Sequence, residues 1–258
     1  MSPTYYAVLL AAALFVGMVL LLELGRRIGA RRMQEDPEGA KAGKGALEGA
    51  VFALFGLLLA FTFSGAASRF EDRKHLVVEE ANDIGTAYLR VDLLPADAQP
   101  EVRDLFRAYL DSRIATYRKL PDITAAYAEL AHSVELQGQI WDRVMRATRV
   151  TGPTPATTLV VRALNDMFDI VTTRTVATKL HPPHILFGLL FVLALACSVV
   201  AGYGTAESRS RSWIHAIGFA AVTSLTVYVI LDMEYPRFGL IRVDAVDEVM
   251  VQVRRSMN

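Results

Sequence analysis

Residues 49–95 of this 258-residue chain read GAVFALFGLLLAFTFSGAASRFEDRKHLVVEEANDIGTAYLRVDLLP, an apolar segment that passes into a charged one without a helix-breaking residue. Gly49–Ser68 carries no charge, and at about 1.5 Å per helical residue it is long enough to cross about 30 Å of hydrocarbon. The next proline, which would end a helix, is Pro95. We therefore expect one helix from about Gly45 to Leu94 that leaves the membrane and continues outside it.

A repeat of apolar residues supports this continuation. Large apolar side chains recur every seven residues along the stretch, at Phe63, Phe70, Val77, Ile84 and Val91. A seven-residue spacing places them along one side of a helix, as in a coiled coil. The repeat predicts that the same helix packs against other helices beyond the membrane.

Three further segments are long and almost free of charge. Tyr5–Leu22 and Ile185–Ala206 contain no charged residue, and Trp213–Leu231 contains only His215. The chain is 53% apolar, with a mean hydropathy of +0.31, which is more apolar material than a soluble domain usually carries. We expect an all-α protein with four transmembrane spans and a soluble helical bundle inserted between spans two and three.

These features divide the chain into four parts. Residues 1–68 hold spans one and two with a basic connecting loop, residues 69–182 form the soluble helical domain, residues 183–233 hold spans three and four, and residues 234–258 form a C-terminal tail. The inserted region shows apolar stripes at helical spacing, for instance Val102, Phe106 and Tyr109. Such stripes are typical of amphipathic helices in a bundle.

Composition and motifs argue against several function classes. Lys and Arg together number 27, as do Asp and Glu, and this zero net charge gives no reason to expect nucleic-acid binding. The sequence has no phosphate-binding loop, no HExxH, no CxxC and no GxSxG. We expect no enzyme, no catalytic residue, no metal site and no cofactor.

Span two presents two distinct faces. One face is made of small residues that include Gly49, Gly56 and Ala60, and small residues let helix backbones approach closely in a membrane. The neighbouring face carries larger side chains, which are Phe52, Phe55, Leu59 and Phe63. This face is either a second packing surface or a hydrophobic constriction around a pore.

Charged residues gather in two places in the inserted region. The first group is Glu79, Glu80 and Asp83, and the second is Arg162, Asp166, Asp169 and Arg174. The carboxylates have the chemistry of a cation site, but they are equally suited to pair with the arginines across the bundle. We expect ion pairing, because charged helix faces are common.

The short loops predict a membrane orientation. The loop between spans one and two carries Arg26, Arg27, Arg31, Arg32, Lys41 and Lys44, and the turn between spans three and four carries Arg209 and Arg211. Short loops rich in Lys and Arg usually face the cytoplasm. The soluble domain would then be extracytoplasmic. No Asp, Glu, Lys or Arg lies near the middle of a span, which disfavours a proton-coupled transporter.

Two stretches resemble a known family. Residues 56–95 and the tail of span four, ILDMEYPRFGLIRV at 230–243, are similar to the signature sequences of a bacterial membrane family described as bestrophin-like. The resemblance implies a multi-pass protein of the bacterial inner membrane that assembles with copies of itself, as the pentameric bestrophins do. Bestrophins are anion channels whose second span lines an aromatic neck, and they place the inserted domain in the cytoplasm.

Two hypotheses follow for function. The first is a homo-oligomeric ion channel or pore in the lipid bilayer, with span two and its extension nearest the axis and inorganic ions passing through it. The alternative is a non-conducting membrane scaffold or sensor whose helical domain binds a partner.

Overall fold

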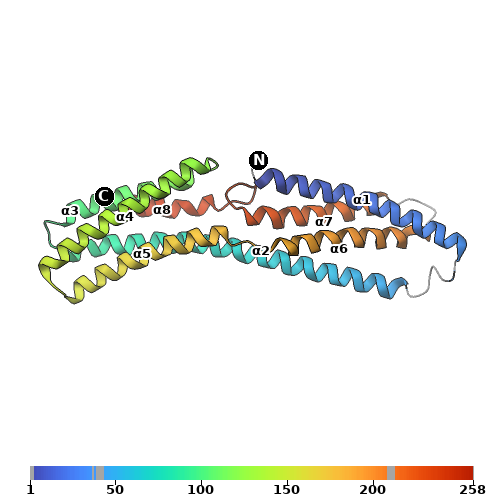
Figure 1. Ribbon diagram of the computed structural model, residues 1–258, viewed down its shortest axis with the longest axis horizontal. Coiled ribbons are helices and arrows are strands. Elements are labelled where there is room, and N and C mark those ends of the chain that lie inside the picture. The colour runs from blue at the N-terminus through green and yellow to red at the C-terminus, as the bar shows by residue number, and fades with distance from the viewer. Residues whose placement is uncertain (1–2, 37, 39–43, 208–212, 258) are drawn as a thin grey trace. The chain divides into compact units, whose positions relative to one another are not determined.

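The computed structural model describes residues 3–36, 38, 44–207 and 213–257, and every regular element in these ranges is helical (Figure 1). The α-helices are α1 (Pro3–Glu35), α2 (Lys44–Leu89), α3 (Gln99–Arg118), α4 (Ile123–Thr151), α5 (Pro155–Lys179), α6 (His184–Gly204), α7 (Trp213–Glu234) and α8 (Glu248–Ser256). Three short 3-10 helices are η1 (Arg90–Leu93), η2 (Thr205–Glu207) and η3 (Asp244–Asp247). The prediction of an all-helical chain is confirmed for these residues.

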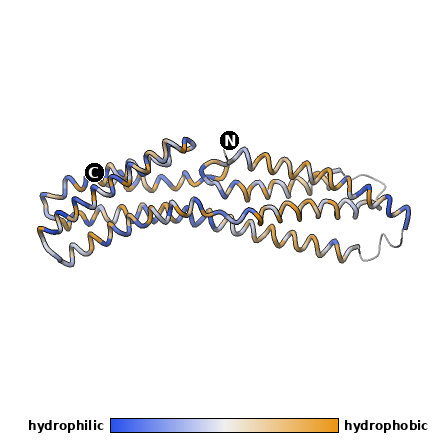
Figure 2. Tube along the Cα trace, in the orientation of Figure 1, coloured by the Kyte–Doolittle hydropathy of each residue, from blue (hydrophilic) through white to orange (hydrophobic). Residues whose placement is uncertain are grey.

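Four of the helices are long and apolar enough to cross a membrane, and they are α1, the first part of α2, α6 and α7. Figure 2 shows the hydrophobic residues concentrated in these helices. The expected number of candidate spans is therefore confirmed. Lys41, Arg209 and Arg211, which enter the prediction of orientation, lie outside the described residues.

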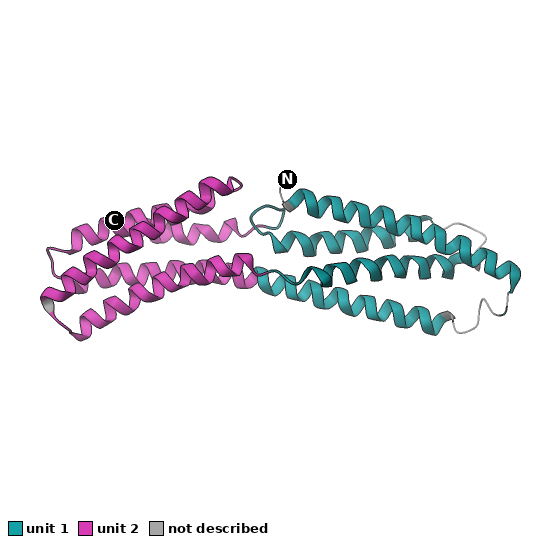
Figure 3. Cartoon of the chain, in the orientation of Figure 1, with its two compact units in different colours: residues 1–70, 181–241 teal, residues 71–180, 242–258 magenta. Residues whose placement is uncertain are grey.

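The chain forms two compact units (Figure 3). The membrane unit consists of residues 1–70 and 181–241, and the helical unit consists of residues 71–180 and 242–258. Residues 242–258, part of the segment 234–258 that the sequence predicts as a C-terminal tail, therefore belong to the helical unit.

The helix α2 runs from Lys44 to Leu89 without interruption, and η1 follows it directly. This agrees with the helix expected from the absence of proline before Pro95. Within the helical unit the seven-residue repeat is buried, since Val77, Ile84 and Val91 all belong to the unit's apolar core. Burial of these side chains stabilises the docking of this half of α2 on the rest of the bundle.

The α1–α6 crossing in the membrane unit has glycines at points of closest approach. A Cβ atom at Gly25 of α1 would lie 2.1 Å from the carbonyl oxygen of Val199 in α6, and one at Gly202 of α6 would lie 2.0 Å from the carbonyl oxygen of Leu22. No side chain fits in so little space. The two backbones therefore touch at this crossing, as small residues permit in membranes.

The carboxylate of Asp232 holds the segment that follows α7 in a turn. Asp232 is buried, and its Oδ2 atom accepts hydrogen bonds from the backbone N–H groups of Leu240 (2.9 Å) and Ile241 (2.8 Å). A Cβ atom at Gly239 would lie 1.8 Å from Oδ1 of Asp232, so only glycine fits there. The spacing of Asp232 and the Gly-Leu-Ile run thus encodes a closed turn at the end of α7.

Candidate functional site

The part of α2 in the membrane unit is the least buried of the four candidate spans. In its most apolar stretch, 11% of the residues are buried within the chain, against 22% for α1 and 33% for α7. A large share of this span is therefore available to lipid, to a second copy of the chain or to an aqueous path.

The four candidates for a pore lining do not share one environment. Phe55 is only 5% exposed and lies in the apolar core of the membrane unit. Phe52 packs edge-on against Phe219 of α7, with ring centroids 6.0 Å apart, and Leu59 is half-buried against the same core. Phe63 is 42% exposed. Phe63 is thus the one of the four that is exposed, although more than half of its surface is still covered within the chain.

The small-residue face of α2 is open. Nothing among the described residues lies within 4 Å of a Cβ atom built on Gly49 or Gly56, and Ala60 is exposed. None of these three residues makes the close helix contact within the chain that Gly25 and Gly202 make. A close contact at this face requires a helix from outside the protomer.

A polar cluster lies at the end of the membrane unit where α7 closes. Glu234 is 2% exposed and pairs with Arg69 of α2, whose Nε atom donates to Oε1 at 3.0 Å. The Nδ1 atom of His181 lies 3.3 Å from Oε2 of Glu234, and its ring stacks against Tyr235 with centroids 4.8 Å apart. Sequence patterns do not reveal this cluster, because its members are far apart in the chain.

The helical unit contains a fully buried ionic network. Glu80 of α2 accepts hydrogen bonds from Nε (2.5 Å) and Nη2 (3.1 Å) of Arg113 in α3, and from Nη1 of Arg174 in α5 (2.5 Å). The side chains of Glu80 and Arg113 are both 0% exposed. Tyr117 completes the network, since its hydroxyl accepts from Nη2 of Arg113 at 3.2 Å and its ring lies 4.0 Å from the guanidinium carbon of Arg174.

This environment fixes the charge of the carboxylate. Burial alone would raise the pKa of Glu80, but Arg113 and Arg174 outweigh burial together and hold the pKa below its usual value. Glu80 therefore remains ionised at neutral pH and offers no proton for exchange. Its role in this arrangement is to join α2, α3 and α5.

The other predicted charged residues are less closely placed. Arg162 and Asp166 are 4.0 Å apart along α5 and both are exposed. Glu79 and Asp169 are exposed, and Asp83 is half-buried. Of the seven residues, the ion pairs bring Glu80 and Arg174 together across two helices.

Arg113 is the residue that sequence reasoning missed. It occupies the apolar stripe of α3, between Tyr109 and Tyr117, and it is buried with that stripe. An arginine on the core side of an amphipathic helix requires a buried acidic partner. The position of Arg113 on the apolar face of α3 was therefore the feature of the sequence that could have identified it.

In the described part of the chain, no three His, Cys, Asp or Glu side chains are grouped as metal ligands.

Comparisons with known proteins agree on one family. The model of the family described as a bestrophin-like domain matches residues 13–246. No curated protein matches the chain.

Solved structures share the fold over nearly the whole chain. A variant of a bacterial bestrophin homologue from Klebsiella pneumoniae superposes with a TM-score of 0.73 at 13% identity, covering 96% of each chain. Another crystal structure of this homologue, phased on zinc, gives 0.67 at 15% identity and covers 94% of this chain and 97% of its own. Because the family model spans most of its length, this chain belongs to the bestrophin-like family.

Proposed function

We propose that the chain is a homo-oligomeric ion channel of the bacterial inner membrane, in which α2 of each copy lies nearest a central axis. Membership in the bestrophin-like family supports this proposal most strongly. The solved bestrophin homologues have the same fold across the membrane unit and the helical unit alike.

The exposure of α2 supports its position at the axis. A face of Gly49, Gly56 and Ala60 meets nothing within the protomer, although small residues in membrane helices usually mark a close helix contact. The proposal assigns this contact to a neighbouring copy. Several copies around an axis would then bring their α2 helices together.

Phe63 is the proposed constriction. It lies one turn beyond Ala60 on α2 and is exposed to the surroundings of the protomer. A ring of aromatic side chains narrows a pore and excludes water when the pore is closed. Phe52, Phe55 and Leu59 support this ring from behind by packing α2 onto the other spans.

An ion-flux assay tests the proposal. The purified protein is reconstituted in liposomes loaded with a chloride-sensitive dye, and parallel liposomes report potassium. We expect flux that depends on the protein and increases in Phe63→Ala, because a smaller side chain widens the constriction. Val222→Ala, on an exposed surface of α7, is the control and should leave the flux unchanged. Absence of flux of both ions in correctly assembled protein contradicts the proposal and favours the scaffold or sensor alternative.

A further inference from the structure

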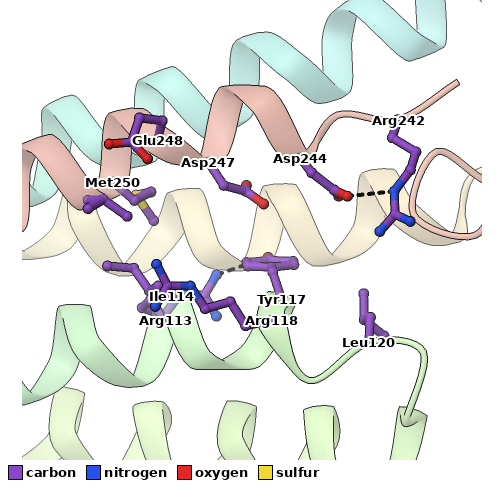
Figure 4. Close-up of a pocket in the computed structure, with 11 residues that line it drawn as sticks. Arg113, Ile114, Tyr117, Arg118, Leu120, Arg242, Asp244, Asp247, Glu248 and Met250 are labelled. Atoms are coloured by element: carbon purple, nitrogen blue, oxygen red, sulfur yellow. Dashed lines mark hydrogen bonds and ion pairs between the residues drawn. The ribbon is translucent and has the colours of Figure 1, made fainter.

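The helical unit contains a cavity that is separate from the membrane spans. It has a volume of about 290 Å³ and is lined by α3 on one side and by residues 242–251 on the other. Figure 4 shows Arg113, Tyr117 and Arg118 of α3 on one side of it and Asp247 and Met250 on the other. Its volume lies just below the range of about 300–1,000 Å³ typical of drug-sized ligand sites, so it suits a small molecule.

A buried donor of one residue that lines this cavity has no hydrogen-bond partner among the described residues. Arg113 is 0% exposed, and its Nε and Nη2 atoms are used by Glu80 and Tyr117. Its Nη1 atom is buried and makes no hydrogen bond with the described residues. Arg113 contributes to the wall of the cavity, and Nη1 is the nitrogen atom of its guanidinium group that no hydrogen bond of the described chain uses. A buried charged donor is costly unless an acceptor satisfies it.

The charges around the cavity favour an anion. Each acidic residue that lines it has a basic neighbour: Asp244 pairs with Arg242 at 2.5 Å, Asp247 lies 3.6 Å from Arg174, and Glu248 lies 3.6 Å from Arg255. Arg118 lines the same cavity and forms no ion pair with the part of the chain described. Two guanidinium groups of α3 therefore supply the unused positive donors.

The remaining walls are apolar. Ile114 and Leu120 line the cavity from the α3 side, and Met250 and Val251 line it from α8. An inorganic ion would leave these walls without contact. A small organic anion would meet the arginines with its charged group and the apolar walls with its hydrocarbon part.

We propose that this cavity binds a small organic anion, a carboxylate or a phosphate monoester, whose charged group is held by Nη1 of Arg113 and by Arg118. The site lies within one protomer. Binding is therefore independent of whether the chain conducts ions.

Calorimetric titration of the full-length protein in nanodiscs tests this site. The probes are benzoate, phenyl phosphate, inorganic phosphate and neutral benzamide, at constant ionic strength. We expect saturable binding of benzoate or phenyl phosphate, whichever charged group fits the arginines better. Inorganic phosphate and benzamide should bind at least about tenfold more weakly, because inorganic phosphate lacks an apolar part and benzamide lacks a negative charge.

Variants locate the binding. Arg118→Gln and Arg113→Lys should each weaken binding by about tenfold or more. Arg146→Gln, an exposed arginine of α4 outside the cavity, serves as the matched control and should bind like the parent protein. If Arg113→Lys does not fold, Arg118→Gln decides, since Arg118 is exposed.

Three results would overturn the site. They are no saturable binding of either organic anion, equal affinity in Arg118→Gln and the parent, and benzamide or inorganic phosphate binding as tightly as the organic anions. The first result would show that the protein binds no such anion. The second would show that the anion binds away from Arg118. The third would show that recognition does not require both a charged group and an apolar part.

Discussion

Glu80 on α2 and Arg174 on α5 are 94 residues apart in sequence, yet Oε2 of the glutamate lies 2.5 Å from Nη1 of the arginine in the core of the helical unit. Arg113 binds the same carboxylate from α3. One acidic side chain thus joins three helices. Removing it would leave two buried guanidinium groups without their shared partner.

The first prediction concerns this network. Glu80→Ala should destabilise the helical unit by about 3–5 kcal/mol, because the arginines lose a buried counter-charge. Unfolding can be followed by the fluorescence of Trp141, which packs against Phe168, in a Trp213→Phe background that contains no other tryptophan. Glu135→Gln, at an exposed position of α4, should change stability by no more than about 0.5 kcal/mol. Equal stability of the two variants would show that the network is dispensable.

The second prediction concerns Asp83. Burial, and then the charges of Glu79, Asp166 and Glu80, raise the pKa of Asp83. A carboxyl with a higher pKa in the folded chain binds more protons when folded, so its ionised form destabilises the fold above both pKa values. Asp83→Asn should therefore raise the unfolding temperature at about pH 7, and the gain should shrink as the pH falls toward about 4.

Thermal unfolding of the parent protein and of Asp83→Asn at several pH values measures this effect. Asp97→Asn, which removes an exposed carboxylate of the same unit, is the control and should show no such pH-dependent gain. A gain for Asp83→Asn that grew on acidification would contradict the direction of the pKa shift.

The third prediction separates two classes of glycine. Gly25→Ala or Gly202→Ala should destabilise the membrane unit by about 1–3 kcal/mol, because the added methyl group meets a backbone carbonyl in the α1–α6 crossing. Gly218→Ala of α7 has open space around it within the chain and is the control. Melting of the detergent-solubilised protein measures the difference. No loss in the first two variants would mean that the helices cross elsewhere.

The fourth prediction concerns assembly. Gly49→Leu and Gly56→Leu should leave the protomer folded, since nothing in the described chain lies near these glycines, but they should break the oligomer by holding neighbouring α2 helices apart. Size-exclusion chromatography with light scattering reads the mass. Gly218→Leu tests whether a bulky side chain on another open surface has the same effect. Native mass in both α2 variants would exclude this face as the interface.

Orientation gives a fifth prediction. A reporter that is active only in the cytoplasm should be on when fused after Lys44 and off when fused at Gly152, as the basic loops imply. The reverse pattern would favour the arrangement known for bestrophins, with the helical unit in the cytoplasm.

Sequence alone predicted the features that depend on local spacing. The absence of proline before Pro95 predicted that α2 is one continuous helix. The seven-residue repeat predicted that Val77, Ile84 and Val91 pack against other helices, and all three are buried. Features that depend on which helices contact each other could not be predicted from the sequence. Gly25 and Gly202 resemble any other membrane glycine until α1 and α6 are placed together.

The candidate site shows the same limit. Helical periodicity placed Phe55 and Phe63 on one face, but packing against the other spans buries Phe55 and leaves Phe63 exposed. Glu80 and Arg174 were identified as charges in need of partners, whereas Arg113 was hidden in the apolar stripe of α3. A pairwise contact between distant segments is decided by the tertiary fold, which periodicity does not report.

The most direct measurement of the proposed pore is cysteine modification during planar-bilayer recording. In a Cys197→Ala background, which removes the only native cysteine, Phe63→Cys places a thiol at the proposed constriction and Val222→Cys places one on an exposed surface of α7. If α2 lines the pore, a charged methanethiosulfonate reagent should block current through Phe63→Cys channels and leave Val222→Cys channels unaffected. Absence of current, or equal block of both variants, would contradict a pore lined by α2.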